Sequence, residues 1–350
     1  MMEGTVFMAW GRFILAAAFV VAAGSLIGRL SGELGERFGL GRAWSGAVLL
    51  SFATTLPELV TTFTAIQRNA VGLALGGVTG TITFNLFILV LVDLIEPEGR
   101  PIYPRVSPQH MATGLLGCLL LGALIFGLAL GQAFPSGSST MGWGLTRAAP
   151  LMLLLFYFLG QRVLYTLARG TPREESPLRL RTVFDRWPTT ALIGTYIAVA
   201  GVILAAGRSL VGSAETLAGV HRWGETFAGA LLLGVVTSLP EISNAVACAR
   251  QKEFDLSVGN VLGANAMVLV VLALAALVYP GGALFAAAPP RDALATVALA
   301  GIALTMQGTL LGALAIHSGH RVWRVGVASV LLAGLYLLSL VATHQFGGVR

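Results

Sequence analysis

Residues 54–59 read TTLPEL, and residues 237–242 read TSLPEI, repeating the first stretch 183 positions later. Each stretch lies inside a long apolar segment and places a glutamate, Glu58 or Glu241, directly after a proline. The same offset aligns the glycine-rich stretches that follow, LGGVTGT and VGNVLGA, without a gap. Because chance does not place such matches in register over this distance, the chain is a tandem duplication.

The composition around these motifs is that of an integral membrane protein. Of the 350 residues, 56% are hydrophobic and 11% are charged, whereas soluble domains carry about 25% charged residues. The mean hydropathy is +0.82. A spanning helix needs about 20 apolar residues, and the alternation of membrane barrel strands is absent from the sequence. We expect ten spans, near 6–28, 43–67, 71–95, 108–131, 144–167, 189–212, 225–249, 256–279, 292–316 and 321–343.

The duplication divides these spans into two sets of five. We expect a first five-helix repeat over 1–167, a short basic linker over 168–188, and a second five-helix repeat over 189–350. Because five is an odd number of crossings, the second repeat is upside down in the membrane relative to the first. The predicted fold class is therefore an all-α integral membrane protein of ten transmembrane helices in two inverted repeats.

The distribution of basic residues predicts the orientation. With both termini outside, 15 of the 22 lysines and arginines fall on the inner side, as the positive-inside rule requires. This places the linker 168–188 in the cytoplasm and the chain in the inner or plasma membrane. The asymmetry also accounts for the net charge of +6, so we expect the lipid bilayer, and no nucleic acid, as its partner.

The two glutamates are candidates for a shared site. A carboxylate inside a bilayer costs at least a few kcal/mol and normally faces a polar cavity. Inverted repeats place equivalent residues around a common point at the middle of the membrane. We therefore expect Glu58 and Glu241 to meet there. The alternative is that each carboxylate lies near a helix end and extends to water.

The prolines belong to the same feature. A proline inside a helix lacks an N–H and frees the carbonyl four residues before it, which places free oxygens near Ala53 and Val236. Inside a bilayer such oxygens persist only when they are buried in protein or line a cavity. Pro57 and Pro240 thus supply backbone ligands for a cation.

Hydroxyl groups complete an all-oxygen set of candidate ligands. Two hydroxyl residues precede each proline–glutamate pair: Thr54, Thr55, Thr237 and Ser238. In the helix after Glu58, Thr81 and Asn85 lie one turn apart on one face and could present oxygens toward it. Oxygen ligands suit hard cations such as sodium and calcium, and not zinc or copper.

Motifs of other functional classes are missing. No pair of histidines has the spacing of a metalloprotease, no G-x-S-x-G motif of a serine nucleophile occurs, and the glycine-rich stretches lack the lysine of a phosphate-binding loop. We expect no enzyme and no cofactor. The cysteines, Cys118 and Cys248, are predicted to be buried and apolar. Gln307 is expected to make an interhelical hydrogen bond, and Asp93 and Glu96 are expected at the membrane interface.

The paired motifs resemble the two alpha repeats of the cation/calcium antiporter superfamily, which includes sodium/calcium exchangers. The resemblance covers about 43–95 and 226–279 by motif and the whole chain by layout. It implies that Glu58 and Glu241 bind calcium and sodium in competition, with Thr54 and Thr237 beside them. It further implies flanking sodium sites lined by Thr55, Ser238 and the backbone carbonyls of Ser51 and Gly234. Thr81 and Asn85 match the polar residues of the family's next helix.

Four positions depart from the family pattern. The second repeat has Ala264 where the family has a serine, and Val268 where it usually has a carboxylate or an amide. The first repeat has Gly77 and Ile82 where asparagines are common. One sodium ligand and one titratable group are therefore missing, which leaves the coupling ion open.

The resemblance implies a secondary active antiporter that exchanges calcium for sodium by alternating access. A proton/calcium exchanger is the alternative, and a membrane protein that binds cations without transporting them is a second one. The transported ions are then calcium with sodium or protons. We expect the glycine- and alanine-rich spans 6–28 and 189–212 to slide past the others, and a monomer suffices for this cycle.

Overall fold

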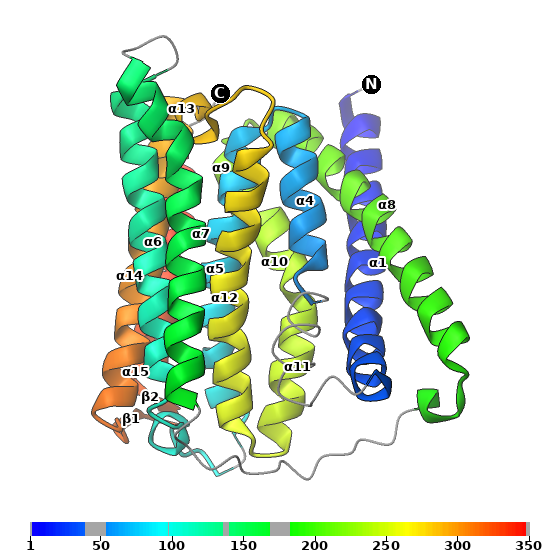
Figure 1. Ribbon diagram of the computed structural model, residues 1–350, viewed down its shortest axis with the longest axis vertical. Helices are drawn as coiled ribbons and strands as arrows, with labels where there is room; N and C mark the ends of the chain where they lie inside the picture. The colour runs from blue at the N-terminus through cyan, green and yellow to red at the C-terminus, as the bar shows by residue number, and fades with distance from the viewer. Residues whose placement is uncertain (1, 39–53, 97, 136–139, 169–182, 348–350) are drawn as a thin grey trace.

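The computed structural model of the chain describes residues 2–38, 54–96, 98–135, 140–168 and 183–347, which are helical almost throughout (Figure 1). The long helices are α1 (Met2–Arg37), α5 (Val71–Leu94), α6 (His110–Ala133), α7 (Thr140–Ala168), α8 (Thr189–His221), α12 (Phe254–Leu277), α14 (Pro290–Ala315) and α15 (Val327–Gly347). The shorter ones are α4 (Leu56–Gln67), η2 (Tyr103–Arg105), η3 (Val183–Arg186), α9 (Glu225–Ala228), η4 (Gly229–Gly234), α10 (Val235–Thr237), α11 (Leu239–Arg250) and α13 (Leu284–Ala287). Strands β1 (Arg321–Val322) and β2 (Val325–Gly326) form an antiparallel hairpin.

Eight of the described helices are long and apolar enough to cross a membrane: α1, α5, α6, α7, α8, α12, α14 and α15. The segments Glu225–Thr237 and Leu239–Arg250 bend by 46° at the break between them, and they make a ninth crossing if the pair is counted as one span. Of the expected span 43–67, only the part from residue 54 onward lies in the described structure, and it contains α4. The expected number of ten spans is therefore approximate.

The duplication is visible in the helix boundaries. Helices α4 and α11 are each 12 residues long and begin 183 positions apart. Helices α5 and α12 are each 24 residues long and have the same offset. The repeated sequence therefore folds into repeated elements of equal length.

The two halves run in opposite directions. In Figure 1 the chain descends through α1 and α5 and rises through their counterparts α8 and α12. Both termini lie at the upper end of the bundle, whereas α7 ends and α8 begins at the lower end. This is the inverted arrangement that an odd number of crossings in each repeat requires.

Helices α1 and α8 pack along each other at one side of the bundle (Figure 1). Both are longer than the expected spans 6–28 and 189–212. At the end of α1, Arg37 pairs with Glu33 at 2.9 Å and donates to the carbonyl of Phe184 at 2.9 Å. These polar contacts let the helix continue beyond its apolar stretch.

Helices α5 and α12 lie at the centre, with 78% and 72% of their most apolar stretches buried. Two glycines let α5 approach the broken crossing of the second repeat closely. A Cβ atom at Gly76 would collide with the backbone of Thr226, and one at Gly80 would collide with Ala230. The glycine-rich stretch therefore holds the break at residue 238 against the centre of the protein.

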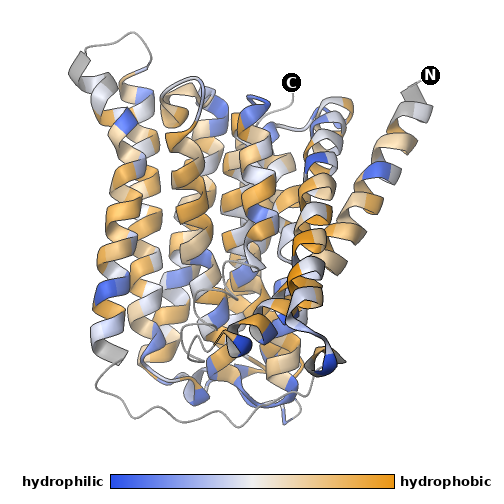
Figure 2. Cartoon of the chain, turned by 45° about the vertical axis from the view of Figure 1, so that its right-hand side comes forward, coloured by the Kyte–Doolittle hydropathy of each residue, from blue (hydrophilic) through white to orange (hydrophobic). Residues whose placement is uncertain are grey.

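The outside of the bundle is apolar along the helices and polar at their ends (Figure 2). Large apolar side chains such as Phe7, Phe158 and Ile197 are exposed by 81%, 64% and 65%. A surface of this kind is compatible with lipid and not with water. The chain is a multi-span helical membrane protein.

Asp93, expected at the membrane interface, is fully buried. It accepts hydrogen bonds from the N–H of Ile102 (2.9 Å), the N–H of Gly326 (2.6 Å) and the hydroxyl of Ser329 (2.6 Å). Asp93 is buried at this helix end because the loop after α5 and the β1–β2 hairpin fold over it. Asp93 thus joins two distant segments of the chain.

Glu96, three residues further on, is also covered. Its carboxylate pairs with Arg105 at 3.0 Å and accepts the backbone N–H of Arg100 at 2.9 Å. Burial raises the pKa of Glu96, but these hydrogen bonds and the arginine charge outweigh burial, so its pKa lies below the ordinary value. Glu96 is therefore a structural carboxylate.

Two smaller predictions can be compared with the structure. Gln307 donates from Nε2 to the carbonyl of Gly114 on α6 at 2.7 Å, which confirms the predicted interhelical hydrogen bond. The cysteines, Cys118 and Cys248, are free, and they are partly buried where the sequence predicted buried residues. Both lie on helix faces that the neighbouring helices cover incompletely.

Candidate cation site

Both proline–glutamate motifs start new helices. Helices α4 and α11 each begin one residue before the proline, which lies in the first turn, where its missing N–H leaves no bond unmade. Glu58 and Glu241 consequently lie in the first turn of a helix. Free N–H groups and the helix dipole favour negative charge at this position.

The two glutamates are buried and incompletely satisfied. Their side chains are exposed by 4% and 2%, and the Oε2 atom of each has no hydrogen-bond partner in the described structure. Glu241 is close enough for its charge to act on that of Glu58. Because an unpartnered buried carboxylate oxygen is costly, both positions are incomplete without a further partner.

The broken crossing of the second repeat presents hydroxyl oxygens. A π-helical turn, η4, precedes the break. Thr237 then donates its hydroxyl proton to the carbonyl of Leu233 (3.0 Å), and Ser238 donates to that of Gly234 (2.8 Å). Since each hydroxyl has used its only proton, its lone pairs are available to a cation.

Thr81 brings the first repeat to this break. Its Oγ1 lies 3.4 Å from Oγ1 of Thr237 and 3.5 Å from the carbonyl oxygen of Gly234. Thr81 stands one residue after Gly80, the close-approach glycine of α5. The small residue therefore puts the hydroxyls of the two repeats within contact distance.

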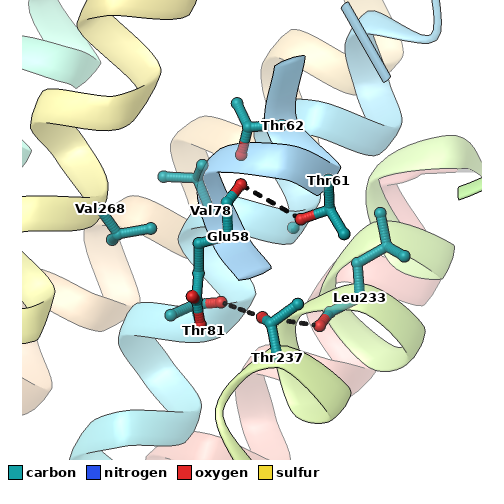
Figure 3. Close-up of a pocket in the computed structure, with 9 residues that line it drawn as sticks. Glu58, Thr61, Thr62, Val78, Thr81, Leu233, Thr237 and Val268 are labelled. Carbon is teal, nitrogen blue, oxygen red and sulfur yellow. Dashed lines mark hydrogen bonds between the residues drawn. The ribbon is translucent and has the colours of Figure 1, made fainter. Parts of the chain in front are cut away.

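A cavity lies beside Glu58, and side chains from both repeats form its wall (Figure 3). Its volume of about 10 Å³ is room for about one water molecule. The wall consists of Glu58, Thr61, Thr62, Gly77, Val78, Thr81, Leu233, Thr237 and Val268. The site is thus polar through one carboxylate and four threonines, and apolar on its remaining sides.

The other candidate ligands occupy different places. Thr54 and Thr55 are buried directly before α4 and are exposed by 3% and 4%, but they do not line this cavity. Glu241, Ser238 and Asn85 are buried and also stand outside its wall. The carbonyl of Gly234 accepts two hydroxyl contacts. Ser51 lies outside the described residues.

Two threonines of this cavity had not been recognised. Thr61 and Thr62 follow Glu58 by three and four residues, so all three share one face of α4. The hydroxyl of Thr61 donates to the carbonyls of Pro57 (3.0 Å) and Glu58 (3.2 Å). Helical spacing from Glu58 would have identified both residues.

Two of the departures from the family pattern, Gly77 and Val268, line the cavity. Val268 forms an apolar part of the wall beside Glu58. Its counterpart in the first repeat, Asn85, donates from Nδ2 to Oδ1 of Asn265 at 3.0 Å. Asn265, which the sequence had not singled out, is therefore the polar partner of an expected ligand.

Comparisons with known proteins agree with this architecture. A family model described as sodium/calcium exchanger protein matches residues 8–165 and 190–343, both halves without the linker. The chain is 28% identical over 250 residues to the inner membrane protein YrbG of Escherichia coli (strain K12), covering 70% of this chain and 72% of YrbG.

Solved structures show the same fold. The H+/Ca2+ exchanger CAX superposes with a TM-score of 0.64 at 14% identity, covering 97% of this chain and 88% of that one. The sodium-calcium exchanger NCX_Mj gives a TM-score of 0.57 at 19% identity, covering 96% of this chain and 98% of that one. The predicted exchanger-like fold of two repeats is thereby confirmed.

Proposed function

Because this chain belongs to the sodium/calcium exchanger protein family, we propose that it exchanges calcium for sodium across the membrane by alternating access. The family is one of antiporters and not of enzymes. In this proposal calcium is held between Glu58 and Glu241, and the same site carries sodium on the return step. The relative YrbG of Escherichia coli is an inner membrane protein, which supports the same location for this chain.

One observation supports this proposal above the others. Two buried glutamates of opposite repeats each keep an Oε2 atom without a partner. Together they carry two negative charges, which match one calcium ion. Once calcium leaves, two carboxylates in a low dielectric cannot both stay bare, so they must take up other cations. This requirement couples the two ion movements.

The neighbouring oxygens have defined roles in the proposal. Thr54 and Thr237 complete the central calcium site. Thr55, Ser238 and Thr81 serve flanking sodium sites, with the backbone carbonyls of Ser51 and Gly234. The hydroxyls of Thr237 and Ser238 already donate to Leu233 and Gly234, so they offer lone pairs and not protons to the ion. Asn85 contributes an amide oxygen.

Sodium is our first candidate for the counter-ion because hydroxyl and carbonyl oxygens suit it and a proton needs none of them. A proton is the second candidate, and a specific observation favours it. The cavity beside Glu58 has room for about one water molecule, and Val268 in its wall supplies no charge.

We further propose the topology that the basic residues predict. The linker 168–188 lies in the cytoplasm and joins a first repeat, 1–167, to a second, 189–350. Helices α1 and α8 pack mainly on each other, which supports their sliding as a pair past the ion-binding helices. Both glutamates of the proposed site belong to one chain, so the proposal requires no more than a monomer.

The test is calcium uptake into proteoliposomes, driven first by an outward sodium gradient and then by an outward proton gradient. Uptake with sodium alone supports our first candidate, and uptake with protons alone supports the second. Glu58→Gln should abolish both. Glu98→Gln is the matched control. Glu98 is an exposed carboxylate that pairs with Lys252 and is not among the proposed ion ligands. Wild-type uptake by Glu58→Gln would refute the proposal.

A further inference from the structure

Two buried asparagines face each other where the repeats meet. Asn85 on α5 and Asn265 on α12 are each exposed by 1%. Asn85 donates from Nδ2 to Oδ1 of Asn265 at 3.0 Å, and Asn265 donates from Nδ2 to the carbonyl of Ile82 at 3.5 Å. The Oδ1 atom of Asn85 is buried and has no partner in the described structure.

The carbonyl of Ile82 fixes the orientation of both amides. A carbonyl oxygen only accepts, so Asn265 must turn its NH2 group toward Ile82 and its oxygen toward Asn85. Asn85 must then turn its NH2 group toward Asn265. The reverse orientation of Asn85 would bring two amide oxygens together. Its own oxygen is thereby directed away from the pair and left free.

The duplication indicates where this free oxygen belongs. Asn85 and Val268 are 183 positions apart, the offset that relates α5 to α12. Val268 lines the cavity beside Glu58. By the pseudo-twofold relation of inverted repeats, Asn85 takes the corresponding place beside Glu241, whose Oε2 is likewise without a partner.

We propose that Asn265 is a positioning residue for cation binding: it holds the amide of Asn85 so that the oxygen, and not the NH2 group, faces the cation. This inference rests on the proposed function, because it assumes that Asn85 is a ligand. An amide turned the other way would point two positively polarised hydrogens at the ion.

A double-mutant cycle distinguishes positioning from a structural role. Asn265→Ala should lower the calcium affinity of the purified protein about tenfold by removing the constraint on the Asn85 amide. In the Asn85→Asp variant, Asn265→Ala should lower calcium affinity by less than about threefold, because a carboxylate presents oxygen in either orientation. Asn265→Leu, which is closer in volume, replaces Asn265→Ala if the smaller residue does not fold.

Gln307→Leu is the control. It removes another buried amide that joins two helices, through Gly114, and should lower thermal stability while leaving calcium affinity unchanged. The inference would be overturned if Asn265→Ala lowered calcium affinity equally in the wild type and in the Asn85→Asp variant. Wild-type calcium affinity in Asn265→Ala would overturn it as well. Failure of the proposed function is recognised separately, since the wild-type protein would then bind and transport no calcium.

Discussion

Gly24 on α1 lies where this helix crosses both proline–glutamate motifs. A Cβ atom at this position would stand 2.9 Å from Cγ of Pro240 and 3.6 Å from Cγ of Pro57. Its counterpart 183 residues later, Gly207 on α8, approaches the first motif, where a Cβ would lie 2.6 Å from Cγ1 of Val60. The duplication has therefore kept a glycine where α1 and α8 each cross the helices that carry the proline–glutamate motifs.

We predict that Gly24→Ala slows transport. The new methyl group would meet a proline ring, which cannot move away as a flexible side chain can, so α1 must shift. Overpacking of this kind costs about 1–3 kcal/mol, which changes the balance between two conformations by about 5- to 150-fold. Alternating access needs both conformations, so turnover should fall about tenfold or more.

The assay is the initial rate of calcium uptake into proteoliposomes, measured beside equilibrium calcium binding by the detergent-solubilised protein. Calcium affinity should stay within about threefold, because Gly24 touches the prolines and not the carboxylates. Gly201→Ala on α8 is the control, since a Cβ there meets nothing within 4 Å. Equal turnover in Gly24→Ala, Gly201→Ala and the wild type would refute the reasoning.

Three further changes are expected to give defined results. Val268→Asp adds a third carboxylate to the site, beside Glu58, so its calcium affinity should differ about tenfold or more between pH 8 and pH 6, whereas Val268→Asn should behave as the wild type. Identical pH profiles of calcium affinity in the two variants would count against the cavity as part of the site. Asp93→Ala leaves the N–H groups of Ile102 and Gly326 unpartnered and should lower the free energy of unfolding by about 3 kcal/mol, seen as a lower melting temperature in detergent; an unchanged melting temperature contradicts the structural role of Asp93. In the folded state the pKa of Glu96 is below its ordinary value. The ion pair of Glu96 with Arg105 therefore stabilises the folded protein fully at pH values above the ordinary pKa, and this stabilisation is lost as the pH falls through the lowered folded-state pKa. The melting temperature of the wild type should thus fall more steeply in acid than that of Glu96→Gln. Parallel curves of melting temperature against pH for the two proteins would contradict a stabilising ion pair at Glu96.

Much of the fold could be predicted because the duplication can be recognised in the sequence itself. The offset of 183 residues relates the ends of α4 to those of α11 and the ends of α5 to those of α12. The prolines determined where the helices break, since the loss of one N–H acts locally. The glutamates could be predicted as site residues from the cost of a carboxylate in lipid. That cost, too, depends on the position of the residue along one segment.

The features that sequence reasoning missed depend on contacts between segments. Asp93 lies at the end of an apolar segment, where exposure is the ordinary expectation, and the loop after α5 and the hairpin 321–326 cover it. The pairing of Asn85 with Asn265 depends on the rotation of α5 against α12, which periodicity cannot supply because both helices are apolar on every side. Val268 marked a missing ligand, but its place in the cavity wall required the packed structure.

The central claim is that Glu58 and Glu241 bind the same ion. The most direct measurement is equilibrium binding of radioactive calcium to the wild type, to Glu58→Gln, to Glu241→Gln and to the double variant, all in sodium-free buffer. A shared site predicts that either single substitution abolishes binding as completely as the double one does. If each single variant still bound calcium with wild-type affinity and only the double variant lost it, the two carboxylates would belong to separate sites and the account would be wrong.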